Sequence, residues 1–168
     1  PEPTPTPTPL PTTPTSTPQT PTTTNQTTSQ GGGASSYSYQ AGDIDINEFV
    51  SDPSDGENEW IELFNKTSRE IDVSNWYIEE GSESKTNVTG IIEARGFIII
   101  EKPKGNLNNS GDIIFLKDKN NLVIDQATYG AWIDQDPADN APQAHDPHSV
   151  ARIYDGYDSG NDYNDFKT

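Results

Sequence analysis

The fold is decided by the segment Glu59-Trp60-Ile61-Glu62-Leu63-Phe64-Asn65. Aromatic and branched residues dominate this segment, and clusters of turn-forming residues lie on both sides of it, at positions 52–56 and 65–68. Such a pattern favours a β-strand, because seven residues are too few for a stable buried helix. We therefore predict a strand over residues 59–65.

Both faces of this strand carry apolar residues. Side chains alternate between the faces of a strand, so Ile61 and Leu63 share one face. Trp60, Glu62 and Phe64 share the other. We expect the first face to contact the core. The aromatic residues of the second face either lie beneath a loop or belong to an exposed surface.

Short apolar runs separated by turn formers continue beyond residue 43. About eight or nine short strands, without convincing helical periodicity, predict an all-β sandwich. The runs 97–100 and 113–116 show no alternation, so we expect strands that are covered on both faces or lie at the sandwich centre. Residues 88–93 and 97–101 are predicted to form a hairpin.

The N-terminal part differs in composition from the rest. Residues 1–24 are almost entirely Thr and Pro and contain nine of the fourteen prolines. Such a segment has no apolar surface to bury, so we expect a semi-rigid spacer of the kind found in O-glycosylated stalks. Residues 25–42 are rich in Gly, Ser and Gln and are expected to be a flexible joint. The predicted organisation is a disordered linker over 1–42 and one domain over 43–168.

Charge and composition restrict the classes of partner. The formal net charge is −17, and nearly all of it falls after residue 43, so nucleic-acid binding is disfavoured. The chain has no cysteine and shows no transmembrane run or signal peptide, so direct membrane insertion is not expected. It also has no methionine, and we expect a fragment of a longer product. The Thr/Pro composition favours an extracellular or cell-surface location.

A series of motifs extends over residues 43–166. In chain order they are Asn47-Glu48-Phe49, the 59–65 strand, Asp72-Val73-Ser74-Asn75-Trp76-Tyr77-Ile78, Gly96-Phe97-Ile98-Ile99-Ile100, Leu107-Asn108-Asn109-Ser110-Gly111-Asp112, Leu116-Lys117-Asp118, Val123-Ile124-Asp125, Ser149-Val150-Ala151-Arg152 and Asp155-Gly156-Tyr157-Asp158. In this order they resemble the lamin-tail domain, in its microbial, extracellular form. The resemblance implies an immunoglobulin-like β-sandwich with an interaction role and no enzymatic activity. The Pro-Thr-Pro-Gly turn that often closes microbial members is missing, and we expect that the last segment is truncated.

One run near the C-terminus has the residue types of a calcium loop. Oxygen ligands of the kind that Ca²⁺ prefers occur at Asp155, Asp158, Asn161 and Asp162. Their spacing does not fit the EF-hand pattern, so the alternative is a solvated, turn-rich acidic tail. We expect no other cofactor.

Arg152 is a rare cation among apolar neighbours. A buried charge must be paired, so we predict an ion pair with Glu62 or Glu48 inside the sandwich.

Two further sets of residues are candidates for surface roles. Trp60 and Trp132 are the candidates for an exposed aromatic binding platform. Asn-x-Ser/Thr sequons, which are glycosylation candidates, occur at Asn25, Asn65, Asn87 and Asn108.

The functional prediction is a non-catalytic binding or tethering module of a cell-surface or secreted protein, with a protein or an extracellular polymer as partner. One alternative is a coat or matrix element that self-associates through strand edges. Another is a carbohydrate-binding module that is accessory to an extracellular hydrolase or nuclease. The oligomeric state does not follow from the sequence.

Overall fold

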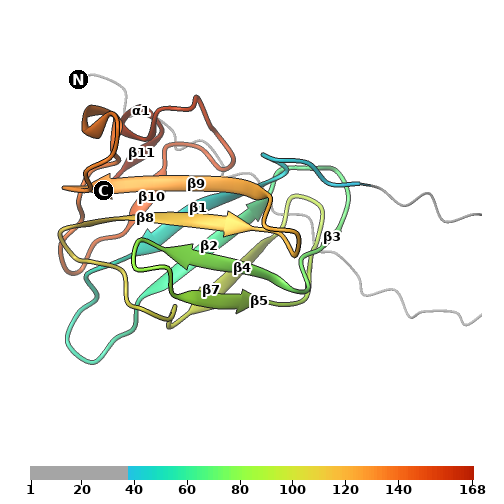
Figure 1. Ribbon diagram of the computed structural model, residues 1–168, viewed down its shortest axis with the longest axis horizontal. Helices are drawn as coiled ribbons and strands as arrows, with labels where there is room; N and C mark the ends of the chain where they lie inside the picture. The colour runs from blue at the N-terminus through green and yellow to red at the C-terminus, as the bar shows by residue number, and fades with distance from the viewer. Residues whose placement is uncertain (1–37) are drawn as a thin grey trace, which may run out of the picture. The chain divides into compact units, whose positions relative to one another are not determined.

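The computed structural model describes residues 38–168, which form two antiparallel β-sheets packed face to face (Figure 1). The predicted fold class, an immunoglobulin-like all-β sandwich, is confirmed. Most of the predicted linker and the sequon at Asn25 lie outside the described residues.

The first sheet has five strands in the order β11-β10-β1-β2-β7. Their bounds are β1 (Ile44–Val50), β2 (Trp60–Asn65), β7 (Phe97–Glu101), β10 (Val150–Arg152) and β11 (Phe166–Lys167). The second sheet has the order β5-β4-β8-β9. It contains β4 (Trp76–Glu80), β5 (Lys85–Val88), β8 (Gly111–Lys117) and β9 (Val123–Gly130).

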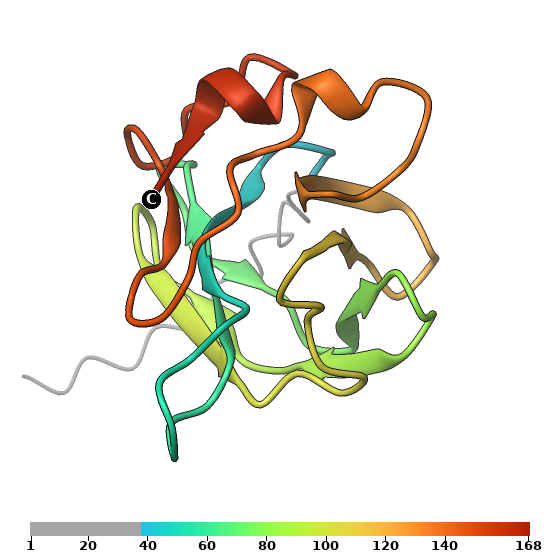
Figure 2. The same ribbon diagram turned by 90° about the vertical axis from the view of Figure 1, so that its left-hand side faces the viewer.

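The remaining elements are short. A two-stranded ladder joins β3 (Ile71–Asp72) to β6 (Ile91–Ile92). A 3-10 turn, η1 (Pro137–Asp139), and a one-turn helix, α1 (Asp162–Asp165), lie in the C-terminal part. Figure 2 shows α1 at one end of the molecule and the loop between β1 and β2 projecting from the opposite end. Neither helical element of residues 38–168 is long and apolar enough to cross a membrane.

The strand predicted over residues 59–65 is confirmed as β2, in the interior of the five-stranded sheet. Ile61 and Leu63 are fully buried and face the second sheet, where Trp76 and Ile114 are also buried. Phe64 is buried as well, whereas Trp60 remains half-exposed. The two aromatic residues of the outer face therefore have different surroundings.

The two runs without alternation are not covered on both faces. In β7, Ile100 is buried while Phe97 and Ile99 are exposed, and β7 is the edge strand next to β2. Burial also alternates along β8. The expectation of doubly covered strands was wrong, because an apolar run does not show whether a second layer covers its outer face. The alternative, a central position, fits β8, which lies between β4 and β9, but not the edge strand β7.

The hairpin predicted between residues 88–93 and 97–101 is also absent from the described residues. Ile91 and Ile92 pair with β3, whereas β7 pairs with β2. The turn before β7 therefore connects β6, which pairs with β3, to β7, which pairs with β2. The strands on its two sides do not pair with each other.

The start of the folded unit and the packing of its C-terminal segment differ from expectation. The ring of Tyr39 contacts Trp76 at 4.6 Å and its hydroxyl donates to Asp118, so the folded unit begins before residue 43. The predicted acidic tail is folded: Asp165 is fully buried, and Phe166 packs 6.0 Å from Phe49 in the core. The composition of this segment does not predict that it is folded, because one aromatic residue, Phe166, attaches it to the core.

Candidate functional site

The outer face of the five-stranded sheet is the candidate functional site, and we call it the open face. Cross-strand pairs define it: Trp60 lies opposite Glu101, Glu62 opposite Ile99, and Phe64 opposite Phe97. On the other side of β2, Glu48 of β1 lies opposite Glu62. Alternation along β2 and β7 places all these side chains on the side away from the core.

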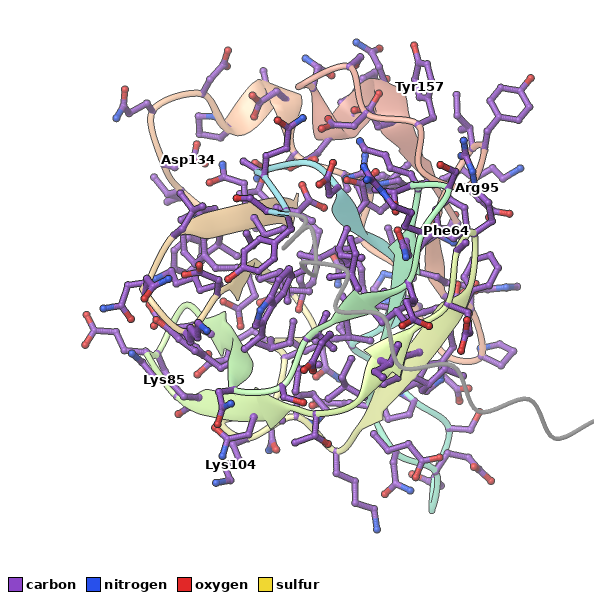
Figure 3. The ribbon with its side chains drawn as sticks, turned by 90° about the vertical axis from the view of Figure 1, so that its right-hand side faces the viewer. Phe64, Lys85, Arg95, Lys104, Asp134 and Tyr157 are labelled. Atoms are coloured by element: carbon purple, nitrogen blue, oxygen red, sulfur yellow. The ribbon has the colours of Figure 1, made fainter. Side chains whose placement is uncertain are left out.

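The open face exposes large apolar groups. Ile99 is 55% exposed and Phe97 is 46% exposed. Phe64 is covered: its ring lies 4.6 Å from that of Phe97, and a Cβ built on Gly156 would lie 2.9 Å from it. Figure 3 shows Phe64 and Tyr157 on the same side of the molecule. The loop around Gly156 therefore closes one end of this face and leaves the other end open.

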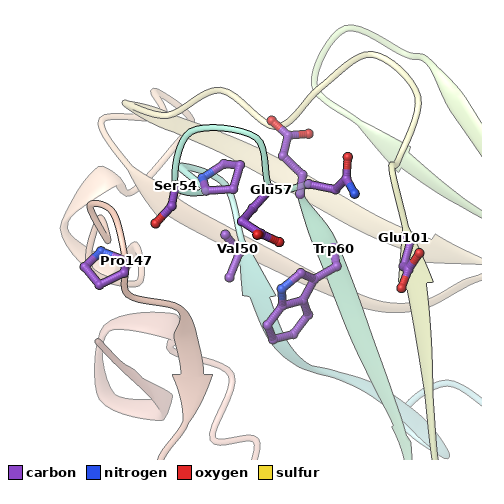
Figure 4. Close-up of a pocket in the computed structure, with 9 residues that line it drawn as sticks. Val50, Ser54, Glu57, Trp60, Glu101 and Pro147 are labelled. Carbon is purple, nitrogen blue, oxygen red and sulfur yellow. The ribbon is translucent and has the colours of Figure 1, made fainter.

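A pocket of about 240 Å³ lies at the open end, next to Trp60 (Figure 4). Val50 and Pro147 lie to one side of the indole in Figure 4, and Glu101 lies to the other. The carboxyl group of Glu57 approaches the indole from the β1–β2 loop. The volume is below the range of about 300–1,000 Å³ that is typical of small-molecule sites. It suits the insertion of one side chain of a larger partner.

The pocket continues into a second hollow of about 420 Å³, so the two together form an elongated groove that suits a peptide segment. The two share Pro53 and the segment 57–59, and the second extends to Lys102, Pro103 and Asn106. Glu59 holds this region together, because its carboxylate accepts a 2.9 Å hydrogen bond from the backbone N–H of Leu107. Burial raises the pKa of Glu59. The groove is therefore built on a fixed loop and has proline and aromatic surfaces.

Carboxylates are interspersed with the apolar residues of the open face. Glu62 accepts a hydrogen bond of 3.0 Å from Asn47 Nδ2, and Glu48 accepts one of 2.6 Å from Ser149 Oγ. Glu101 is exposed beside Trp60. The sheet register places one lysine, Lys167, on the same face at the far edge strand. A partner with apolar and basic side chains would match this surface.

Arg152 is buried as predicted, but its predicted partners are wrong. Its Nη2 lies 3.1 Å from Asp125 Oδ2, and its Nη1 lies 3.9 Å from Asp158 and 3.7 Å from Asp165. Glu62 and Glu48 instead bond to the amide and hydroxyl groups described above. They lie on the open face, whereas the guanidinium points toward β9 and the C-terminal segment.

The Arg152–Asp125 pair also completes backbone hydrogen bonding at β1. Asp125 Oδ2 accepts from the N–H of Ile46 at 2.6 Å, and Arg152 Nε donates to the carbonyl of the same residue at 2.8 Å. The strand register shifts just after Ile46. At this residue the side chains of Asp125 and Arg152 make the backbone hydrogen bonds that a neighbouring strand would otherwise make. Burial raises the pKa of Asp125 to about 7, against the lowering effect of Arg152.

Trp132, the second predicted aromatic platform, is half-buried. A Cβ built on Gly81 would lie 2.6 Å from Trp132 Cη2, so the indole lies directly on the Gly81 backbone. Asn140 Nδ2 donates to the Trp132 carbonyl at 2.9 Å, which holds the loop after β9 in place. Trp132 thus packs against the turn after β4 and is not a free platform.

The sequons have different environments. Asn65 is fully buried, and its Nδ2 donates to the carbonyls of Arg69, Ile92 and Glu93. A glycan on this nitrogen is incompatible with the fold, so that prediction was wrong. Asn87 and Asn108 are exposed, and their glycosylation stays a prediction.

The four calcium candidates are divided between separate places. Asp155 is exposed and accepts a hydrogen bond from Asn47, while the side chain of Asn161 caps α1. Asp158 and Asp162 line the same acidic pocket together with Asp125. Sequence spacing missed Asp125 and also the wholly buried Asp45, because both reach this region from distant strands.

Sequence analysis also missed Phe97 and Ile99 as surface residues. Their position on an edge strand depends on which strands pair, which the apolar run does not reveal.

Comparison with known proteins gives one result. A search of curated protein sequences found no match. A family model described as Lamin Tail Domain matches residues 37–131, which covers both sheets except β10 and β11. Domains of this family are immunoglobulin-like, non-enzymatic and mediate protein interactions. Because the match spans more than half of the chain, the chain belongs to the lamin tail domain family.

Proposed function

We propose that this chain is a non-catalytic binding and tethering module that holds a protein partner against the open face, outside the cytoplasm. The observation that supports this proposal is the exposure of Ile99 and Phe97 on the same sheet face as Trp60, whose side chain lines the pocket. Exposed apolar residues that are contiguous and rimmed by polar groups are typical of interaction sites. Family membership agrees with an interaction role.

The chemistry of the face defines the partner. An apolar side chain of the partner fills the pocket beside Trp60, and basic side chains contact Glu101, Glu62 and Glu48. The charge pattern contributes orientation and association rate, while the aromatic and branched residues contribute most of the affinity. The partner is therefore a protein segment that combines apolar and basic residues.

The extracellular location rests on the Thr/Pro-rich composition of residues 1–24, which is typical of surface spacers. In this proposal the spacer holds the domain away from the surface to which the protein is attached.

The open edge of the five-stranded sheet supports a second candidate function, self-association. Within residues 38–168, β7 pairs with β2 on one side and leaves its other edge without a neighbouring strand. Such an edge is a template for pairing with another chain. A carbohydrate-binding role has less support, because Trp132 is packed against Gly81.

The test is a selection of displayed random peptides on the full chain, followed by calorimetric titration of the best selected peptide. Ile99→Glu should weaken its binding at least tenfold, because it places a carboxylate among the apolar contacts. Ile91→Glu is the matched control: Ile91 is also 55% exposed but lies on β6. Its binding should stay within twofold of the wild type.

Three outcomes would contradict the proposal. Equal binding by wild type and Ile99→Glu would place the interaction elsewhere. Concentration-dependent sedimentation that is lost in Ile99→Glu, without peptide selection, would favour self-association. Retention on a glycan array that is lost in Trp60→Ala would favour carbohydrate binding.

A further inference from the structure

A second pocket, of about 180 Å³, lies beside the Arg152 cluster, away from the Trp60 groove. Three segments bring carboxylates to it: β9, the loop after β9, and the segment leading into α1. The carboxylates are Asp125, Asp134, Asp139, Asp158 and Asp162. Asp134 is labelled in Figure 3. We call this the acidic pocket.

Hydrogen bonds fix three of these side chains through one oxygen each. Asp162 Oδ2 accepts from the N–H and Oγ1 of Thr128, at 2.7 and 2.8 Å. Asp158 Oδ1 accepts from Gly160 N–H at 2.9 Å, and Asp125 Oδ2 accepts from Ile46 N–H. The second oxygen of each carboxylate remains for another ligand. Because the first oxygens are held, the carboxylates are oriented in advance.

An additional buried carboxylate, Asp45, points to a missing ligand. Asp45 is 0% exposed, and its Oδ1 has no hydrogen-bond partner. One oxygen from each of Asp45, Asp125 and Asp158 lies within 4.8 Å of the others. A buried carboxylate oxygen without a donor is costly, and three carboxylates this close repel one another. Asp125 and Asp158 belong to both this trio and the acidic pocket.

The cations in the structure balance this charge only in part. Lys66 Nζ lies 2.9 Å from Asp45 Oδ2, and Arg152 contacts Asp125. Arg152 Nη1 is used by the Tyr157 carbonyl at 2.7 Å and lies 3.9 Å from Asp158. Two cations, Lys66 and Arg152, are therefore set against five carboxylates. These are the three of the trio and those of Asp162 and Asp165.

We propose that one Ca²⁺ ion binds between Asp45, Asp125 and Asp158, next to the acidic pocket that Asp162 also lines. Carboxylate oxygens are hard ligands, and Ca²⁺ accepts six to eight of them or of waters in irregular geometry. Mg²⁺ requires a near-octahedral set at shorter distances, and Zn²⁺ prefers His or Cys ligands. The three carboxylates come from irregularly arranged segments, which favours Ca²⁺.

The ion would connect parts of the chain that the family match separates. Asp45 and Asp125 lie within residues 37–131, whereas Asp158 and Asp162 lie beyond them. Calcium would therefore fasten the C-terminal segment, including α1 and β11, onto β1 and β9.

The experiment is a calorimetric titration of Ca²⁺ into the full chain, freed of metal with a chelator and dialysed at pH 7. We expect one ion per chain with a dissociation constant on the order of 10⁻⁴–10⁻³ M, as in extracellular calcium modules. Saturating Ca²⁺ should also raise the melting temperature. Asp158→Asn and Asp45→Asn should each weaken binding at least tenfold while preserving the circular dichroism spectrum of the metal-free protein.

Asp155→Asn is the matched control. Asp155 lies in the same segment, but it bonds to Asn47 and does not line the acidic pocket. Its calcium affinity should equal that of the wild type. Absence of binding up to about 5 mM Ca²⁺, an equal affinity for Mg²⁺, or an equal loss in Asp155→Asn would overturn the proposal. If Asp158→Asn does not fold, unchanged calcium binding by Asp45→Asn would overturn it instead.

Discussion

Replacing Arg152 by methionine tests the account of the buried ion cluster. Methionine retains most of the apolar stem, which passes over the ring of Phe166, where the guanidinium carbon lies 4.6 Å from the ring centroid. The substitution removes the charge next to Asp125 and the donors to the carbonyls of Ile46 and Tyr157. It therefore isolates the polar contribution of Arg152.

The size of the effect depends on pH through Asp125. Its pKa is raised to about 7 by burial, so protonation of Asp125 stabilises the fold fully below its ordinary pKa. This contribution is lost as the pH rises through about 7. Without Arg152 the pKa of Asp125 rises further, because the guanidinium is what lowers it. The stability of the variant therefore continues to fall at higher pH. The difference in the free energy of unfolding between variant and wild type grows with pH.

These contributions predict how much Arg152→Met destabilises the protein at two pH values. At pH 5 Asp125 is protonated in both proteins, and the variant loses two hydrogen bonds to carbonyls, worth about 1 kcal/mol each. At pH 8.5 the variant leaves a buried carboxylate without its partner, which costs about 3–5 kcal/mol. The destabilisation should therefore increase by about 1–3 kcal/mol between the two pH values.

The assay is urea unfolding followed by tryptophan fluorescence, with a chelator present so that metal binding does not contribute. Trp76 is 1% exposed and reports on the core. Arg95→Met is the control: Arg95 is exposed, and its variant should remain within about 0.5 kcal/mol of the wild type at both pH values. A loss for Arg152→Met below about 1 kcal/mol at pH 8.5, or one that is equal at both pH values, would refute the reasoning.

Two other substitutions have defined outcomes. Asn65→Ala should lower the free energy of unfolding by about 2–4 kcal/mol in the urea assay, because three carbonyls lose their shared donor. The control Asn87→Ala, at an exposed position, should change it by less than about 0.5 kcal/mol. Similar values for both variants would contradict the role of Asn65. Gly81→Leu should displace the Trp132 ring, shift tryptophan emission to longer wavelength and cost about 1–3 kcal/mol. The spectral shift should disappear in a Trp132→Phe background, and its persistence there would contradict the packing of Trp132 on Gly81.

The local part of the fold follows from the sequence. The alternation of Ile61 and Leu63 with Trp60 and Glu62 depends only on strand geometry, and the structure confirms it. Asn121 adopts the left-handed conformation, φ 66°, which asparagine tolerates in turns. Such features depend on neighbouring residues, so a sequence pattern is sufficient to predict them.

The position of a strand within its sheet is not a local property. The Phe97–Ile100 run has an apolar composition that fits a doubly covered strand, yet β7 lies at a sheet edge. Its outer residues are exposed because no layer packs on them. The open face was predicted only at Trp60, because its other apolar members depend on the pairing of β7 with β2.

Partners of buried charges are still harder to predict. The residue type of Arg152 and its apolar neighbours were sufficient to predict its burial and its need for a counter-charge. The choice among more than twenty acidic residues required the three-dimensional arrangement, and the predicted partners, Glu62 and Glu48, face the other side of the sheet. Asp125 reaches Arg152 from the second sheet.

The C-terminal segment is an integral part of the domain. The family match ends at residue 131, yet β10 and β11 supply two of the five strands of the first sheet. The dependence is also electrostatic: Asp125 lies within the matched residues, and its buried counter-charge Arg152 lies beyond them. A chain ending at residue 131 would retain the buried carboxylate without the guanidinium and would expose the β1 edge that β10 covers. The folding unit is therefore longer than the part that the family model matches, and residues from both sides of residue 131 line the acidic pocket.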